Sequence, residues 1–168
     1  MRGHLTVTRY LVALGSNVRH PRHGPPRRVL KAAFAALNEN ALQLDARSPI
    51  IDSAPLGPSR RRYANAAGIV ATSLEPQVML AALQDIESRF GRLRRGMRWG
   101  ARVLDLDIVM WSGGPFAADG LVIPHPEFRR RDFVLRPSVM IAPEWRDPLT
   151  GLKLQHLQAR LTRSEPLA

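Results

Sequence analysis

The sequence contains no cysteine, and it has no hydrophobic run long enough to cross a membrane. The absence of cysteine excludes disulfides, zinc fingers and cysteine nucleophiles. A membrane-spanning helix needs about 20 consecutive apolar residues. The first residues, MRGHLTVTRYLVALGSN, lack the uninterrupted apolar stretch and the cleavage site of a secretory signal. We therefore expect a soluble protein that resides in the cytoplasm.

Lysine is also scarce, although the chain is strongly basic. Of its 25 basic residues only Lys31 and Lys153 are lysines, and against 14 acidic residues the net charge is +11. The planar guanidinium of arginine binds phosphate oxygens in pairs. A charge of this size suggests an anionic partner, either nucleic acid or a highly charged small molecule. Each arginine-rich stretch, at 60–62, 89–102 and 129–131, is equally compatible with a solvated surface.

Length and hydrophobicity indicate one folded domain. With 168 residues and a hydrophobic fraction of 45%, the chain can bury a sizeable core. The sequence shows no repeat, low-complexity segment or internal linker. We expect a single domain over residues 1–168, with loose ends at 1–6 and 162–168.

The order of hydrophobic patterns along the chain predicts an α+β fold. Apolar runs and alternation predict strands, and apolar faces at helical spacing predict helices. The main predicted elements are strand 10–14, helix 26–39, strand 42–51, strand 63–73, helix 75–90 and strand 103–111. This β-α-β-β-α-β order matches the ferredoxin-like arrangement, in which helices pack on one face of an antiparallel-rich sheet. The additional short elements predicted are a strand at 121–123, helical turns at 127–131 and near 138–141, and a small helix within 152–161.

The strand at 103–111 carries the strongest chemical signal, the sequence Asp105-Leu106-Asp107. Residues i and i+2 of a strand point to the same side, so the two carboxylates lie about 6–7 Å apart. Two negative charges at this separation repel unless a cation intervenes, and Mg²⁺ prefers such oxygen ligands while leaving room for substrate phosphates. The flanking residues are strongly apolar, which favours a place deep in the fold. The alternative is an exposed strand with solvated aspartates, and the short motif by itself favours that alternative.

An arginine-rich segment leads directly into this strand. Residues 91–102 have the sequence GRLRRGMRWGAR. Carboxylates that hold a metal and arginines that hold phosphate oxygens are the groups that phosphoryl transfer requires. The glycines allow the segment to move as a lid, and Trp99 could exclude water from the site. The alternatives are a loop that contacts nucleic acid and a loop that is merely solvated.

His125 is a further candidate, and it lies between Pro124 and Pro126. The prolines stiffen the backbone and hold the imidazole in place. An isolated histidine is more often structural than catalytic. A phosphate contact is reasonable for His125 because other phosphate-binding groups are present, among them Arg131.

These segments together resemble one enzyme family over nearly the whole chain. The matching segments are ALGSN at 13–17, APLGP at 54–58, YANAA at 63–67, GRLRRGMRWGARVLDLDI at 91–108, IPHPEFRRRDFVLRP at 123–137 and IAPEW at 141–145. They are similar to the 6-hydroxymethyl-7,8-dihydropterin pyrophosphokinases of folate biosynthesis. The block at 91–108, joined to the Pro-His and Phe-Val-Leu segments, carries most of the specificity.

The resemblance implies a reaction and its cofactors. A pyrophosphoryl group would pass from ATP to the hydroxymethyl oxygen of the dihydropterin, and AMP would be released. Two Mg²⁺ ions are implied at Asp105 and Asp107, which match the family's metal ligands. These aspartates, with Arg92 and Arg102, match its catalytic residues. No residue matches a dedicated base, so the metal-bound geometry is expected to supply most of the activation.

The resemblance also implies two binding sites. The residues at nucleotide-binding positions are Leu80, Gln84, Glu87, Arg94, Trp99, Arg102, Ile108, His125 and Arg131. The residues at pterin-binding positions are Ser53, Leu56, Tyr63, Asn65 and Phe133. Tyr63 and Phe133 match the aromatic pair that sandwiches the pterin ring. Asn65 matches the side chain that hydrogen-bonds the edge of the ring.

The chain departs from the family pattern in places. Gly120 stands where some members present an arginine to ATP, Pro126 replaces an aromatic residue, and the loop at 57–62 is shorter and rich in arginine. These differences bear on nucleotide affinity and loop closure rather than on the reaction.

Two other functions compete with the enzyme. A nucleic-acid-binding module would account for the charge, but the sequence lacks the aromatic cluster of RNA-binding sheets, and the two aspartates would repel phosphate without a metal. A non-catalytic scaffold would not require both the aspartates and the arginines. We expect a monomer with ATP and the hydroxymethyl-dihydropterin as partners, and with no nucleic-acid or membrane partner.

Overall fold

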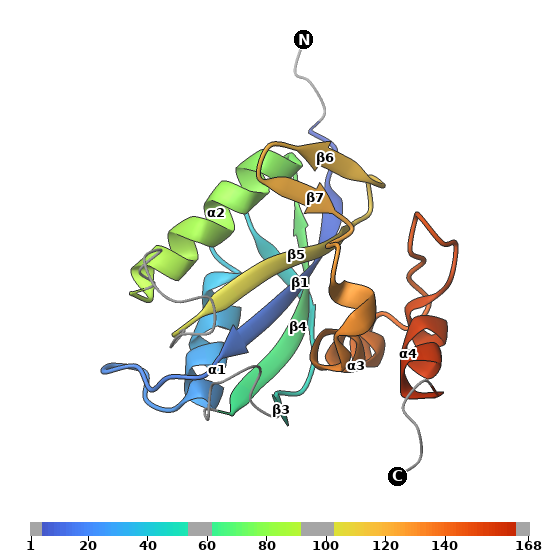
Figure 1. Cartoon of the computed structure of the whole chain (residues 1–168). Helices are drawn as coiled ribbons and strands as arrows, with labels where there is room; N and C mark the ends of the chain where they lie inside the picture. The colour runs from blue at the N-terminus through green and yellow to red at the C-terminus, as the bar shows by residue number, and fades with distance from the viewer. Residues whose placement is uncertain (1–4, 54–61, 92–102, 164–168) are drawn as a thin grey trace.

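The computed structural model of the chain describes residues 5–53, 62–91 and 103–163. Its elements, in chain order, are β1 (Thr8–Ser16), α1 (Pro26–Ala36), β2 (Gln43–Arg47), β3 (Ile51–Ser53), β4 (Tyr63–Thr72), α2 (Pro76–Arg89), β5 (Asp105–Trp111), β6 (Phe116–Ala118), β7 (Leu121–Ile123), η1 (Phe128–Arg130), α3 (Asp132–Ile141) and α4 (Leu154–Arg163) (Figure 1). The predicted α+β class is confirmed. No helix among the described residues is long and apolar enough to span a membrane.

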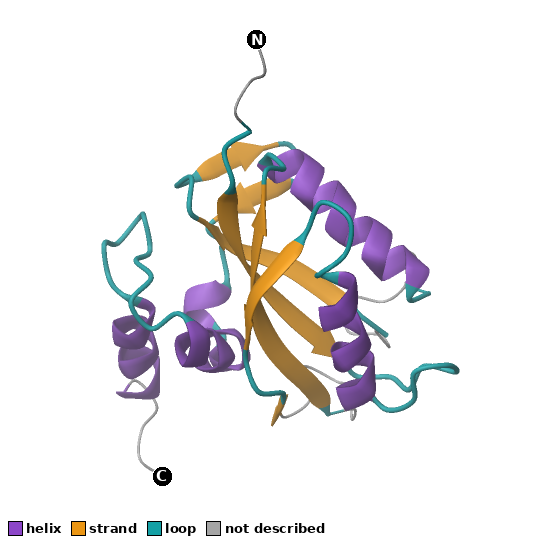
Figure 2. Ribbon diagram, turned by 180° about the vertical axis from the view of Figure 1, so that it is seen from behind, coloured by secondary structure: helices purple, strands orange, loops and turns teal. Residues whose placement is uncertain are grey.

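Five strands form one antiparallel sheet. Its order is β2-β4-β1-β5, and β3 pairs with the end of β4 that β2 does not reach. The central strands β1 and β4 pair along their whole length, and β5 pairs with the other side of β1 (Figure 2). The strands β6 and β7 form a separate ribbon, of which only β7 was predicted. The strand β1 therefore brings β4 and β5 into register on its two sides.

The predicted strand at 42–51 is two strands, because its middle leaves the regular ladder. Between β2 and β3, the N–H of Ser48 donates to the carbonyl of Ala67, and the N–H of Ala67 donates to the Ser48 hydroxyl, both at 2.8 Å. The side chain of Ser48 thus replaces a backbone acceptor. Pro49 follows, and it has no N–H to continue the ladder.

The helices α1 and α2 cover one face of the sheet, as predicted. Proline at the start of α1 is tolerated because the first turn lacks intrahelical acceptors for its N–H groups. The buried apolar residues of both helices recur at helical spacing and include Val29, Leu30, Ala33 and Phe34 on α1 and Met79, Leu83 and Ile86 on α2. They pack against the strands to form the first hydrophobic core.

The helix α3 packs on the opposite face, where the sequence predicted no helical layer, and α4 packs on α3 (Figure 1). The expected short turn near 138–141 is the end of α3, which is ten residues long. Pro137 inside the helix obscured its helical pattern, since it removes one backbone donor. Ser138 bonds back to the carbonyl of Val134 at 2.6 Å, which satisfies its hydroxyl inside the second core.

The strand β5 does not alternate regularly along its whole length. Ile108 pairs with Val12, but the next residue of β1, Leu11, pairs with Met110, so Val109 is an extra residue. The predicted single face with Leu104, Leu106 and Ile108 therefore ends before Met110, which packs in the second core instead. The bulge leaves the alternation around the two aspartates unchanged.

Replacing Leu135 with alanine should destabilise the fold strongly. The Leu135 side chain on α3 is 0% exposed, and its removal leaves a cavity against the sheet. We expect the free energy of unfolding, measured by urea denaturation, to fall by about 3 kcal/mol. The control Met140→Ala lies on the same helix at 51% exposure, and it should change this free energy by less than about 0.5 kcal/mol. Equal losses for both variants would contradict the packing of α3 on the sheet.

Candidate active site

The strands β4, β1 and β5 form a floor of mostly small residues on the sheet face that carries α3. Gly15 of β1 pairs with Asn65 of β4 on one side and with Asp105 of β5 on the other. Residues paired across strands project from the same face, so the Asn65 and Asp105 side chains are two strand spacings, or roughly 10 Å, apart. The next row of the same face consists of Ala67, Ala13 and Asp107. Small residues thus separate an amide from two carboxylates.

Asp105 and Asp107 project from β5 as the alternation predicts. Both are half-buried, whereas Leu104, Leu106 and Ile108 are buried in the first core. Among the described residues, no group of three or more His, Cys, Asp or Glu side chains converges on a metal position. Mg²⁺ is commonly bound by one or two carboxylates, with water and substrate phosphates completing its octahedron. The donor set therefore fits a magnesium ion that is bound together with a phosphorylated ligand.

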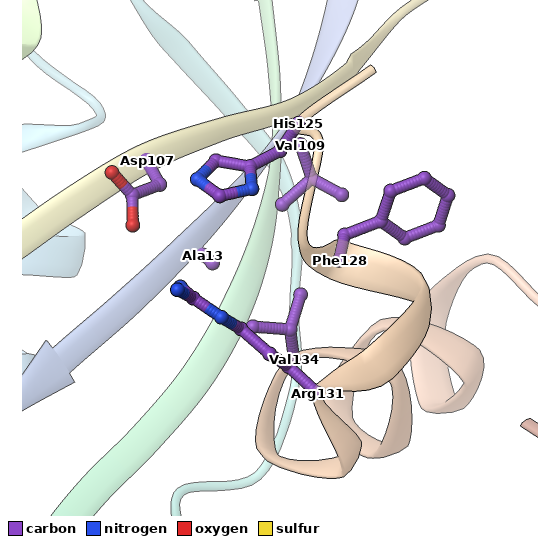
Figure 3. Close-up of a pocket in the computed structure, with 7 residues that line it drawn as sticks. All are labelled: Ala13, Asp107, Val109, His125, Phe128, Arg131 and Val134. Atoms are coloured by element: carbon purple, nitrogen blue, oxygen red, sulfur yellow. The ribbon is translucent and has the colours of Figure 1, made fainter. Parts of the chain in front are cut away.

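A small pocket opens beside Asp107 (Figure 3). Its residues are Asp107, His125 and Arg131 and the apolar Ala13, Val109, Phe128 and Val134. The Asp107 carboxylate, the His125 ring and the end of the Arg131 side chain surround one space. The carboxylate, the imidazole and the guanidinium around this space suit a phosphate group accompanied by a cation.

Two backbone contacts fix His125. Its N–H donates to the carbonyl of Val109 at 2.9 Å, and its Nδ1 accepts a hydrogen bond from the N–H of Glu127 at 3.1 Å. A neutral imidazole that accepts at Nδ1 carries its proton on Nε2. Burial and, after it, the charge of Arg131 lower the pKa of His125, although Glu127 and Asp105 oppose the shift. At neutral pH the ring can therefore donate one hydrogen bond to an anion.

Arg131 connects the pocket to the start of α3. Its carbonyl accepts hydrogen bonds from the N–H groups of Val134 and Leu135 at 3.0 and 2.9 Å. Its guanidinium carbon lies 5.8 Å from the centre of the Phe133 ring, within cation–π range. One predicted phosphate-binding residue thus touches one predicted pterin-binding residue.

Asn65 is fixed on the other side of the floor. It is 3% exposed, and its Nδ2 donates to the hydroxyl of Ser53 on β3 at 2.6 Å. Tyr63 pairs directly with Ser53 and projects from the same face of β4 as Asn65. The helix α3, which carries Phe133, packs against both β3 and β4. The structure therefore places the described pterin-position residues around one end of the sheet.

Four predicted nucleotide-binding residues lie on the other side of β5, where α2 packs: Leu80, Gln84, Glu87 and Ile108. Glu87 is 5% exposed, and its carboxylate accepts a hydrogen bond from the N–H of Leu106 at 3.0 Å. Ile108 is 4% exposed and belongs to the first core. The structure does not bring these residues together with the aspartates, because β5 separates the two groups.

Several predicted site residues lie outside the described residues, namely Leu56, Arg92, Arg94, Trp99 and Arg102. Their roles stay predictions from the sequence.

The small residues of the floor are the part of the site that sequence reasoning missed. A Cβ on Gly15 would lie 3.5 Å from Asn65 Oδ1 and 3.8 Å from Tyr63 Cδ1, so it would fill the space beside both side chains. The available signal was the alternation of Ala13 and Gly15 with bulky residues on one buried strand. Such a pattern marks a strand face that something approaches closely.

The fold and the site together define a class of protein. The antiparallel sheet of this α+β fold presents paired carboxylates beside a pocket that holds His125 and Arg131, and across a floor of small residues it presents an amide beside an aromatic ring. Carboxylates for a metal beside cationic groups for phosphate are typical of phosphoryl-transfer enzymes.

Comparison with known proteins defines the family. The 7,8-dihydro-6-hydroxymethylpterin-pyrophosphokinase (HPPK) family matches residues 11–143. The 2-amino-4-hydroxy-6-hydroxymethyldihydropteridine pyrophosphokinase of Pseudomonas aeruginosa is 40% identical over 143 residues, which cover 84% of this chain and 85% of the relative. The Synechocystis protein of the same name is 37% identical over 142 residues, which cover 84% of this chain and 70% of the relative. The chain belongs to the 7,8-dihydro-6-hydroxymethylpterin-pyrophosphokinase family.

Solved structures share the fold. Crystal structures of wild-type Plasmodium falciparum HPPK-DHPS match with TM-scores of 0.70 with pteroate and 0.71 with SDX-DHP, each at 12% identity over 92% of this chain. The match covers 42% and 44% of those chains, so this chain spans less than half of their length. The similarity confirms the predicted ferredoxin-like arrangement.

Replacing Arg131 with methionine should raise the pKa of His125. The variant removes a positive charge that disfavours protonation, while burial, the larger cause, remains. In the unmodified protein we expect a value below about 6.5, and in Arg131→Met a value closer to it. NMR of the imidazole C–H signals against pH measures both. Arg130→Met, which removes an exposed neighbouring charge, serves as control. A His125 pKa that responds equally to both variants would place Arg131 away from this pocket.

Proposed function

We propose that this chain transfers a pyrophosphoryl group from ATP to the hydroxymethyl oxygen of 6-hydroxymethyl-7,8-dihydropterin and releases AMP, as a step of folate biosynthesis. The observation that carries the proposal is the shared floor, on which Gly15 separates Asn65 from Asp105. A ligand bound at Asn65 and a ligand bound at Asp105 would lie side by side on this floor. Gly15, which lies between the two residues in the sheet, has no side chain to separate the ligands. Membership of the pyrophosphokinase family supports the choice of both substrates.

The proposed reaction is a displacement at phosphorus. The hydroxymethyl oxygen attacks the β-phosphorus of ATP and forms a new O–P bond. The bond from this phosphorus to the oxygen that bridges the α-phosphate breaks, and AMP leaves with the electron pair while the hydroxyl proton is released. Most of the catalysis in such a reaction comes from positioning and charge stabilisation.

The described pocket supplies the phosphate contacts in this proposal. Arg131 can donate two parallel hydrogen bonds to phosphate oxygens, and neutral His125 can donate one from Nε2. Asp105 and Asp107 would hold two Mg²⁺ ions, which supply charge neutralisation and orientation of the attacking and leaving oxygens. We assign further contacts with ATP to Arg92, Arg94, Trp99 and Arg102 from the family motif.

The pterin binds at the other end of the floor in this proposal. Tyr63 and Phe133 would stack on the flat ring, because offset aromatic contacts favour planar heterocycles. Asn65 can donate to and accept from the ring edge, and the 2.6 Å hydrogen bond to Ser53 fixes the orientation of its amide. Leu56 completes this site from the family motif.

The nucleoside of ATP extends past β5 in this proposal. Phosphates at Asp107 lie on one face of β5, and the predicted nucleoside contacts at Leu80, Gln84, Glu87 and Ile108 lie on the other. Because β5 is an edge strand, a ligand can reach both of its sides around that edge. We further propose that the chain acts as a single-domain monomer in the cytoplasm.

The reaction is tested by mixing the protein with ATP, Mg²⁺ and the hydroxymethyl-dihydropterin. We expect AMP, and ADP in its place would refute pyrophosphoryl transfer. Asp107→Asn should lower kcat at least about 100-fold, because the carboxylate acts on charge that develops in the transition state. Asp119→Asn, an exposed residue between β6 and β7, is the matched control and should retain normal turnover. Normal turnover of a folded Asp107→Asn variant would show that the metal assignment is wrong.

Ser53→Ala should weaken pterin binding selectively. The variant removes the acceptor of the Asn65 amide, and the loss of one such buried hydrogen bond corresponds to about tenfold in KM for the pterin. The KM for ATP should stay unchanged, because Ser53 is remote from the phosphate pocket. Steady-state kinetics measure both constants, with Ser112→Ala, an exposed residue directly after β5, as the control. A parallel rise in both KM values would argue against a dedicated pterin site at Asn65.

A further inference from the structure

The single turn η1 links the two predicted phosphate-binding residues of the pocket. It separates His125 from Arg131, and long backbone bonds of 3.3 Å connect it to both: Phe128 N–H to the His125 carbonyl, and Arg131 N–H to the Phe128 carbonyl. A 3₁₀ turn of this length has little stability of its own. Its position, and with it the positions of His125 and Arg131, depends on what its side chains contact.

The main polar contact of this turn is a bidentate ion pair between Arg129 and Asp147. Arg129 Nε lies 2.6 Å from Asp147 Oδ2, and Arg129 Nη2 lies 2.8 Å from Asp147 Oδ1. Asp147 is 0% exposed and also accepts bonds from Leu149 N–H at 3.0 Å and the Thr150 hydroxyl at 2.8 Å. Burial alone would raise the pKa of Asp147, but the hydrogen bonds from Arg129, Leu149 and Thr150 outweigh it and hold the pKa below its usual range. The pair is therefore ionised at neutral pH.

Asp147 belongs to a segment that is itself held firmly between α3 and α4. Its N–H donates to the Leu152 carbonyl at 2.9 Å, and its carbonyl accepts from Gly151 N–H at 2.8 Å. On the other side, the Arg129 guanidinium carbon lies 4.6 Å from the centre of the Phe128 ring, and that ring is buried in the second core. Arg129 thus connects η1 to the hydrogen-bonded segment that contains Asp147. Arg129 itself does not line the pocket.

We propose that Arg129 and Asp147 form a positioning pair for the phosphate-binding half of the site. The pair holds η1 in place and so sets where His125 Nε2 and the Arg131 guanidinium meet the ligand. This inference rests on the proposed function, in which those two residues bind the phosphates of ATP. Outer contacts that orient binding groups typically contribute 10–100-fold, and a shift of about 1 Å can cost about 100-fold in rate.

Four single variants test the pair in the intact protein. Asp147→Asn keeps the shape of the carboxylate, Arg129→Met removes the guanidinium, and Arg129→Lys keeps the charge without the fork. Arg130→Met, on the same turn but exposed, is the matched control for loss of charge. We expect KM for ATP to rise about tenfold or more in Asp147→Asn and Arg129→Met, less in Arg129→Lys, and by less than about twofold in Arg130→Met. The KM for the pterin should stay within about twofold throughout.

Hydrogen–deuterium exchange gives a second readout that needs no turnover. Amides of residues 125–131 should exchange faster in Asp147→Asn and Arg129→Met, while those of β1 and β4 keep the exchange rates of the unmodified protein. If the unmodified protein makes no AMP, the proposed function is wrong, and exchange alone then shows whether the pair holds η1. If turnover is normal and folded variants lose only melting temperature or active fraction, with KM for ATP unchanged, the pair is structural and the positioning role is refuted. Unchanged exchange at 125–131 also refutes it.

Discussion

The alternation of side chains along β5 is the constraint on which the site depends. Leu104, Leu106 and Ile108 are buried in the first core, so the residues between them, Asp105 and Asp107, must project from the opposite face. A slip of one residue would place both carboxylates in the core and expose the apolar side chains. Hydrophobic burial under α2 therefore fixes two charged groups on the far side of the strand, without any direct contact between the core and a ligand.

The sequence predicted the buried face of a helix or strand correctly wherever the hydrophobic periodicity of that element alone determines it. The face of α1 and the direction of Asp105 and Asp107 follow from periodicity alone, and these predictions are confirmed. The face of α2 is confirmed except for Val78, which periodicity placed on the buried face and which is 54% exposed. The break between β2 and β3 could not be predicted in this way, because it depends on hydrogen bonds of Ser48 with a residue on another strand. The extent of α3 was also underestimated, since Pro137 disrupts the local signal while the second core holds the helix on the sheet.

The arginine residues near the site also show that a local sequence pattern does not predict tertiary contacts. The run at 129–131 is uniform in sequence, yet Arg129 forms an ion pair with the buried Asp147, Arg130 is exposed and Arg131 lines the pocket. The partner of Arg129 is eighteen residues away, so no local pattern reveals it. A net charge of +11 therefore includes charges that are neutralised inside the fold, and its size alone does not indicate a nucleic-acid surface. The family motif identified Arg131 as a phosphate-binding candidate. The different environments of Arg129, Arg130 and Arg131 are determined by tertiary contacts.

The hydrogen bond between Glu87 and β5 protects an edge of the sheet from pairing with other molecules in a concentrated solution. A strand at the edge of a sheet exposes backbone groups that can template pairing with another molecule. Glu87 engages the N–H of Leu106, and the N–H of His125 engages the carbonyl of Val109 further along the same strand. An incoming strand would have to displace both contacts and the buried carboxyl group of Glu87. The strand that carries the two aspartates is thereby guarded against intermolecular β-sheet growth, the first step of amyloid-like self-association.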